Sequence, residues 1–177
     1  MLFAHDTEVS LTAAVRLVNS ASDPDTLVTI ADLDDFYTEF EYTGRRDGDM
    51  SELEEVRQLR HELREMLTGE RDDAAEIVNR MLAQAGAVPR LVRHNCWDWH
   101  VHAVDPEAAL PTRMAVETAM AMIELIRADE MSRLGVCAGQ ACDGVVLDLS
   151  RNRSRKFCST ACGNRVAVAH YRARRGS

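Results

Sequence analysis

The sequence is short of several features that would indicate particular classes of protein. Its 177 residues contain no apolar run of about eighteen residues or more, so it predicts no transmembrane helix. No apolar segment with a cleavage site precedes Leu11, and nothing therefore directs the chain to an oxidising compartment. We expect a cytoplasmic protein.

Motifs of the common enzyme classes are also absent. The chain contains no HExxH sequence, no nucleophile elbow and no P-loop, so we expect no catalytic activity. Aromatic residues make up only 5% of the sequence, and the last 41 residues contain just Phe157 and Tyr171. Because single-stranded nucleic acids are bound by stacking bases on aromatic rings, this scarcity favours duplex DNA over RNA as a ligand.

Cysteine is scarce too, but its distribution is informative. Four of the five cysteines form two short pairs in the last 41 residues, Cys137-x4-Cys142 and Cys158-x3-Cys162. Zinc prefers four thiolates in a tetrahedron, and two pairs separated by a hairpin can supply them. The spacing therefore predicts a structural Zn²⁺ site.

Two other interpretations of these cysteines stay open. Disulfides need an oxidising compartment, which nothing in the sequence indicates. An iron–sulfur cluster could use the same four thiolates, and only the wide middle spacing favours zinc over iron. The fifth cysteine, Cys96, is distant in sequence, and we expect it to be a small buried apolar residue.

Charge divides the chain into two parts. Residues 1–136 carry 13 arginines and 27 acidic residues, a net charge of −14, whereas residues 137–177 carry eight basic and two acidic residues, a net charge of +6. This asymmetry predicts two domains, 1–136 and 137–177, and a polyanion as the partner of the second. Because a unit of about 40 residues is too small to fold on apolar burial alone, zinc should be part of its folding.

Periodicity predicts an α+β fold that is mainly α-helical. Apolar residues recur at helical spacing over 8–19, 27–43, 51–68, 72–85 and 112–133. Ser51 and Glu54 form a candidate capping box for the third helix, and Asp73 and Glu76 for the fourth. The resulting first domain is helical, with one β-hairpin.

That hairpin is predicted at 88–104, where the pattern changes to period two. We place its turn near Asn95-Cys96, with Arg93 opposite Asp98, which puts the neighbouring histidines on a solvated face. The alternative is a polar pocket for a small-molecule effector. The residues concerned are His94, Asp98, His100 and His102.

The C-terminal part resembles a treble clef. We expect a zinc knuckle at 137–142, two strands near 145–149 and 155–158, and a helix from about 159 that Ser159 caps and whose first turn holds Cys162. The helix dipole would stabilise thiolates there. Gly163 inside this helix predicts a close approach by another part of the finger.

The sequence Cys162-Gly163-Asn164-Arg165 resembles the CGNR zinc-finger family. The whole chain is similar to two-domain proteins in which such a finger follows a helical ABATE domain, a family of stress-induced transcription regulators. The resemblance extends to LVN at 17–19, LVRHNCWDWHVHA at 91–103 and DLSRNRSRKFCSTACGNR at 148–165. It implies a zinc-dependent regulator. Many relatives have a lysine where this chain has Ala167, which removes one phosphate contact.

The basic residues of the finger are the candidate DNA contacts. Arginine can bind phosphate or guanine with two hydrogen bonds at once. The candidates are Arg151, Arg153, Arg155, Lys156, Asn164, Arg165, Arg172, Arg174 and Arg175. Three alternatives remain: the finger docks on the acidic first domain, it binds another protein, or the hairpin makes the first domain a small-molecule-binding protein. Because one finger offers a small DNA footprint, a homodimer is also expected.

Overall fold

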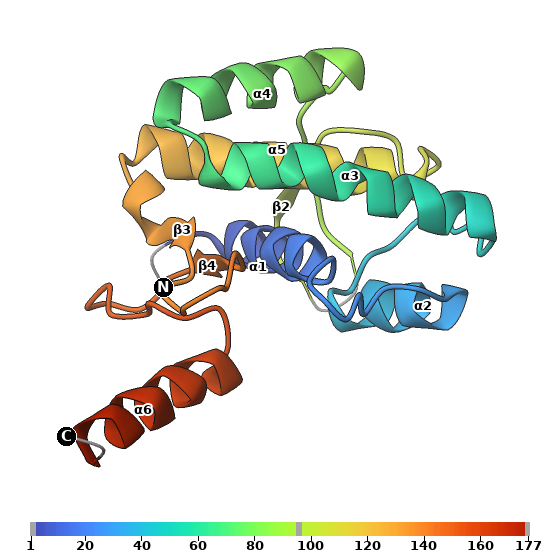
Figure 1. Cartoon of the computed structure of the whole chain (residues 1–177). Coiled ribbons are helices and arrows are strands. Elements are labelled where there is room, and N and C mark those ends of the chain that lie inside the picture. Colours follow the sequence, from blue (N-terminus) through green and yellow to red (C-terminus); the bar gives the residue numbers. More distant parts are fainter. Residues whose placement is uncertain (1–2, 95–96, 176–177) are drawn as a thin grey trace.

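The computed structural model describes residues 3–94 and 97–175, and in these ranges the chain is mainly helical (Figure 1). This confirms the α+β prediction. Cys96 and the proposed turn at 95–96 lie outside the described residues. The helices are α1 (His5–Asn19), α2 (Ile30–Glu39), α3 (Met50–Thr68), α4 (Arg71–Gln84), α5 (Leu110–Arg127), the 3-10 helix η1 (Met131–Arg133) and α6 (Thr160–Arg175). The strands are β1 (Arg90–Val92), β2 (His100–His102), β3 (Leu134–Val136) and β4 (Val145–Leu147). None of the described helices is long and apolar enough to cross a bilayer.

Four helices, α1, α3, α4 and α5, form the body of the molecule around one apolar core. Helix α1 packs along α5 and α3, α4 covers the outer side of α3 and α5, and α2 lies at one end (Figure 1). Leu11, Leu53, Met114 and Leu125 are fully buried between them. Each comes from the apolar stripe of its helix, which is how an amphipathic helix stabilises a bundle.

Two helices, α2 and α3, begin at other residues than predicted because their capping was misread. Helix α3 begins one residue before the predicted Ser51, because Asp49 is its N-cap and accepts a hydrogen bond from the backbone N–H of Glu52. The capping box of the body belongs to α2, where the Thr29 hydroxyl accepts from Asp32 N and the Asp32 carboxylate accepts from Thr29 N. This cap makes the helix predicted at 27–43 begin at Ile30, and the helix ends at Glu39.

Buried arginines hold several loops to the body. The guanidinium of Arg113 donates to three backbone carbonyls, those of Thr43, Arg45 and Ala108. Arg133, 5% exposed, donates to the carbonyls of Asp148 and Ser150. Part of the arginine content of this chain therefore serves loop anchoring, because a guanidinium has five donors in a fixed geometry.

The predicted strand pairing of the finger is wrong. Strand β4 pairs antiparallel with β3, which lies before Cys137, and residues 155–158 form no strand. Residues 155–158 instead pass beside the loop between Cys137 and Cys142, where the backbone N–H of Ala138 donates to the carbonyl of Lys156. Strand β3 has only three residues, too few for its alternating pattern to be recognised in the sequence.

Strand β4 joins the finger to the body. Its Val145 and Leu147 side chains belong to the same apolar core as α1 and α5. The Asn19 side chain, at the C-terminal end of α1, accepts from Val145 N at 2.7 Å and donates to Val145 O at 2.8 Å. Arg64 of α3 adds a hydrogen bond to Asp143 O. The finger is thus attached to the body through its hairpin.

Replacing Asn19 by alanine should weaken this attachment. The change leaves both backbone polar groups of the fully buried Val145 without partners, which we expect to cost about 2–4 kcal/mol of unfolding free energy. Urea unfolding of the zinc-loaded protein measures it. The matched control is Asn79→Ala, at an exposed position of α4, with an expected change below about 0.5 kcal/mol. Equal stability of the two variants would contradict the role of Asn19.

Candidate metal centre and nucleic-acid interface

The four C-terminal cysteines converge on one point. Their sulfur atoms all lie within 4.8 Å of one another, with Cys137 Sγ 3.4 Å from Cys162 Sγ and Cys142 Sγ 3.6 Å from Cys158 Sγ. These separations exclude disulfides, whose sulfurs are about 2.05 Å apart. They fit the edge of about 3.8 Å that a ZnS₄ tetrahedron has with Zn–S bonds of about 2.3 Å. Cys137, Cys142, Cys158 and Cys162 therefore form a structural Zn²⁺ site.

The backbone around the cysteines is arranged to hold thiolates. The N–H groups of Gly139 and Cys158 both donate to Cys137 Sγ. Burial by itself would raise the pKa of Cys137, but these two donors lower it to about 7. Burial and the neighbouring thiols raise the pKa of Cys158 to about 12. Four thiolates can coexist here only with a cation between them, and a zinc ion supplies that charge.

Glycine and a helix cap bring the cysteine pairs together. A Cβ at Gly139 would lie 2.5 Å from Cys162 Sγ, so only glycine allows this approach. The Ser159 hydroxyl accepts from Cys162 N at 3.1 Å, as predicted, and starts α6. A Cβ at Gly163 would lie 3.2 Å from the Phe157 ring, which explains the glycine inside this helix. The close neighbour at Gly163 is thus an aromatic side chain of the finger.

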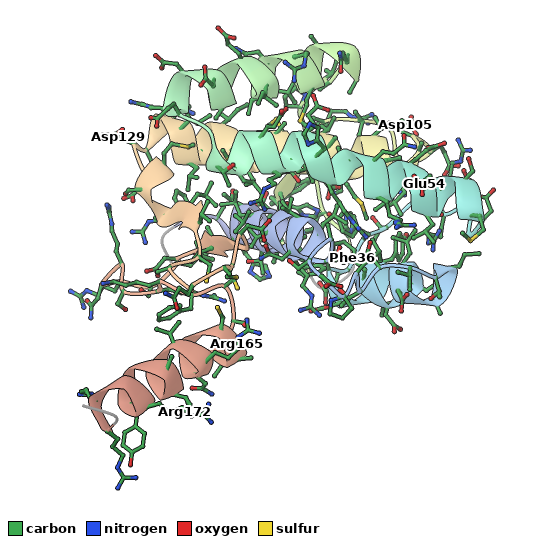
Figure 2. All side chains as sticks on the ribbon, viewed as in Figure 1. Phe36, Glu54, Asp105, Asp129, Arg165 and Arg172 are labelled. Carbon is green, nitrogen blue, oxygen red and sulfur yellow. The ribbon has the colours of Figure 1, made fainter. Side chains whose placement is uncertain are left out.

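Helix α6 stands apart from the body and is basic. It extends from the cysteine cluster away from the bundle (Figure 1), and residues 149–177 contain eight basic residues and no acidic one. Figure 2 shows Arg165 near the start of this helix and Arg172 further along it. All nine predicted contact residues are exposed.

These residues differ in whether their side chains already interact with other groups of the protein. Arg153 pairs with Glu130 at 2.7 Å, and Arg155 bonds backbone carbonyls of the finger. The guanidinium of Arg165 lies beside the Cys162 sulfur, and this interaction raises the pKa of Arg165. The guanidinium of Arg175 covers the Tyr171 ring. Four cations have no side-chain partner within the described part of the chain: Arg151, Lys156, Arg172 and Arg174.

Asp148 shapes the loop that carries the first arginines. Its carboxylate is 5% exposed and accepts from Ser150 N at 2.8 Å and from Arg155 N at 2.6 Å. The bond to Ser150, together with the Arg155 N–H and the charge of Arg133, holds the pKa of Asp148 below its usual value of 3.8. Sequence analysis missed this residue because an aspartate beside a turn is common.

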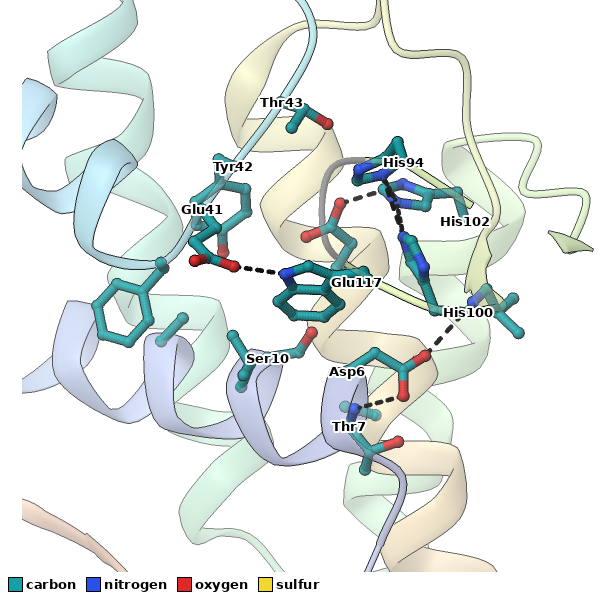
Figure 3. A pocket seen from close by; sticks show the side chains of 16 residues that line it. Asp6, Thr7, Ser10, Glu41, Tyr42, Thr43, His94, His100, His102 and Glu117 are labelled. Carbon is teal, nitrogen blue, oxygen red and sulfur yellow. Dashed lines mark hydrogen bonds and ion pairs between the residues drawn. The ribbon is translucent and has the colours of Figure 1, made fainter. Parts of the chain in front are cut away.

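The hairpin histidines face inward, so the prediction of a solvated face is wrong. Val92 pairs with His100, one residue away from the predicted register, and the slip moves the histidines to the buried side. His100 is 8% exposed. The Nε2 atoms of His94, His100 and His102 lie 3.1 Å from one another in every pair. Figure 3 shows the three rings meeting at one side of a pocket.

Asp98 does not line this pocket. Its side chain is exposed, and only its backbone carbonyl takes part, 2.7 Å from His100 Nδ1. The acidic groups near the histidines are Asp6 from α1, whose carboxylate accepts from Val101 N, and Glu117 from α5, 3.5 Å from His102 Nδ1. The sequence pattern gives no signal for Glu117, because it comes from a helix distant in sequence.

Burial shifts the pKa values of two histidines and of Glu117 in this pocket. It raises the pKa of Glu117 to about 7, and it lowers the pKa of His102 to about 4, with the charges of His100 and His94 adding to the effect. Burial also lowers the pKa of His94. Both histidines are therefore neutral at pH 7. The cavity they line has a volume of about 70 Å³, enough for a few water molecules or a small ligand.

A tetrathiolate finger joined to a helical body defines the class of this protein: a zinc-finger protein with an additional helical module. Comparison with protein families agrees. A model of the CGNR zinc finger matches residues 133–175, and a model of the ABATE domain, described as "Putative stress-induced transcription regulator", matches residues 11–129. The chain belongs to the ABATE family and carries a CGNR zinc finger. A search of curated proteins finds no match.

The close approach at Gly139 gives a test of the metal centre. Gly139→Ala should displace the Cys162 sulfur and weaken zinc binding at least tenfold, as measured by competition with a chromophoric chelator. Gly135→Ala in β3 is the matched control, because a Cβ there meets no atom within 4 Å. Equal zinc affinity in the two variants would show that the cysteines do not close around one ion.

Protonation of Asp148 at low pH, or its mutation, should release the loop of residues 149–156, which we call the arginine loop. The depressed pKa means that the carboxylate stabilises the fold above pH 3.8 and that this contribution is lost as the pH falls through the folded-state value. Asp148→Asn should cost about 1–3 kcal/mol at pH 7 and reduce hydrogen-exchange protection of the Arg155 amide. Asp143→Asn, whose side chain is 84% exposed, is the control. Unchanged protection at Arg155 would refute the anchoring role.

Proposed function

We propose that this protein is a transcription regulator whose finger binds duplex DNA through α6 and the arginine loop, residues 149–156. The observation that carries the proposal is that α6 projects away from the body and that all its charged residues are basic. Helix α6 is attached to the body through the hairpin whose connecting loop holds two of the zinc ligands. Such a helix has the diameter that the major groove admits, and its 16 residues span about 24 Å. The family description as a transcription regulator supports the same function.

The free cations of the finger are the proposed phosphate contacts. Arg151, Lys156, Arg172 and Arg174 are exposed and unpaired within the described residues, so they can bind phosphate without breaking an existing interaction. Asn164, exposed in the second turn of α6, is placed to reach a base edge. Arg165 has a different first role: its charge offsets the excess negative charge of four thiolates around one Zn²⁺.

The body is the proposed sensor. Helix α1 connects its pocket with the finger, because Asp6 at one end bonds the histidine-bearing strand and Asn19 at the other end bonds β4. A ligand that shifts α1 would therefore act directly on the strand that supports the finger. A homodimer presenting two fingers would enlarge the small footprint of a single finger.

Salt-dependent DNA affinity tests the function of the finger. Arg172→Ala with Arg174→Ala should weaken binding to duplex DNA and lower the slope of log K against log salt by about two, one for each lost phosphate contact. Fluorescence anisotropy with zinc-loaded protein measures both. The control is Arg127→Ala, at a side chain 75% exposed at the end of α5, and its slope should stay unchanged.

Selection from fragmented genomic DNA at about 0.15 M salt then decides between DNA and protein as the partner. Enrichment of discrete sites that the double variant loses supports a sequence-specific regulator. Uniform retention of all fragments, or no retention at all, favours a finger that docks on another protein. The exposed Val168 and Tyr171 of α6 would then be its contact residues.

A further inference from the structure

We propose that His94, His100 and His102 bind a divalent transition-metal ion, a second metal site distinct from the cysteine cluster. The ion would be the ligand that the body senses. This regulatory role rests on the proposed function, whereas the existence of the metal site does not. The three Nε2 atoms form a triangle with sides of 3.1 Å beside the cavity in Figure 3.

Hydrogen bonds on the far side of two rings determine which nitrogens carry protons. His100 Nδ1 lies 2.7 Å from the Asp98 carbonyl, which can only accept, so Nδ1 carries the proton and Nε2 has a free lone pair. His102 Nδ1 lies 3.5 Å from the carboxylate of Glu117, which favours the same tautomer. Metal-binding histidines are oriented in this way by carbonyls and carboxylates.

Without a cation this arrangement is poorly satisfied. Two Nε2 lone pairs lie 3.1 Å apart, and a proton on His94 Nε2 could be donated to only one of them at a time. His94 Nδ1 is buried and has no hydrogen-bond partner in the described part of the chain. An ion that accepts all three Nε2 lone pairs removes the conflict between them, because each Nε2 atom then has a partner.

The triangle also has the size of a coordination face. A point about 1 Å above its plane lies roughly 2.1 Å from each nitrogen, with N–metal–N angles of about 95°, close to the Zn–N distance found in proteins. Three protein ligands leave at least one coordination position for water or a small ligand. The cavity of about 70 Å³ that the same rings line can hold such a ligand.

The surroundings favour a cation over an anion. Glu117 and Asp6 lie around the histidines but are not among the converging ligand atoms, so they act as outer-sphere partners. Three imidazoles suit Zn²⁺, Ni²⁺, Co²⁺ and Cu²⁺, whereas Mg²⁺ and Ca²⁺ prefer oxygen ligands. All three ligands come from the hairpin, which Asp6 of α1 and Glu117 of α5 contact, so the ion would bind where the hairpin meets these two helices.

Metal stoichiometry of tag-free, full-length protein tests the proposal. After loading with Zn²⁺ and removal of the excess, wild type should hold two ions per chain, and His102→Gln and His94→Ala one. His61→Ala is the matched control, because this histidine is 83% exposed on α3, and it should hold two. Circular dichroism and retention of the first zinc show that each variant is folded. One ion in wild type, or two in the pocket variants, overturns the proposal.

Cobalt identifies which ligands bind the second ion. Protein with one equivalent of Zn²⁺ at the cysteines should bind Co²⁺ without thiolate-to-metal charge-transfer absorption, and its Tm should rise with Co²⁺ concentration. Glu117→Gln should keep the stoichiometry but lower Co²⁺ affinity about 10–100-fold, because Glu117 is a positioning residue for His102. Charge-transfer absorption on adding Co²⁺ would place the ion at the cysteines and refute the site. These measurements need no DNA, so a failure of DNA binding leaves their outcome unaffected.

Discussion

The convergence of four thiolates on one point is the constraint on which the finger depends. The apolar cluster of the finger consists largely of its own cysteines with Val146 and Phe157, so little other burial stabilises it. Helix α6 begins within this cluster, between Cys158 and Cys162. The direction in which the basic helix projects is therefore a consequence of metal coordination, and the loss of zinc removes the support of α6.

Attachment of the finger to the body depends on a different kind of interaction. Strand β4 contributes Val145 and Leu147 to the core of the bundle, and Asn19 satisfies both backbone groups of Val145. Zinc thus organises the cysteine cluster and the start of α6, whereas apolar burial holds the β3–β4 hairpin against the body. Because α1 carries Asn19 at one end and Asp6 at the other, the body and the finger share a helix that touches both sites.

The helices of the body were predictable, because the apolar stripe of each is a local pattern and most of the helix bundle follows from it. The cysteine site was predictable for a similar reason: its ligands lie in two short pairs whose spacing suits one ion. Capping was misread at Asp49 and missed at Thr29, which shifted the ends of two helices. Strand pairing in the finger failed because β3 and β4 have three residues each.

The sequence by itself determined the helical body, the zinc ligands and the basic charge of the last helix, since each depends on residue type and local spacing. Only the tertiary structure decided where the histidines point and which arginines are free. A slip of one residue in a hairpin reverses its faces, and the core chooses between the two registers. Likewise, the sequence does not distinguish Arg153 and Arg165 from Arg172. In the structure, Glu130 lies beside Arg153 and Cys162 lies beside Arg165.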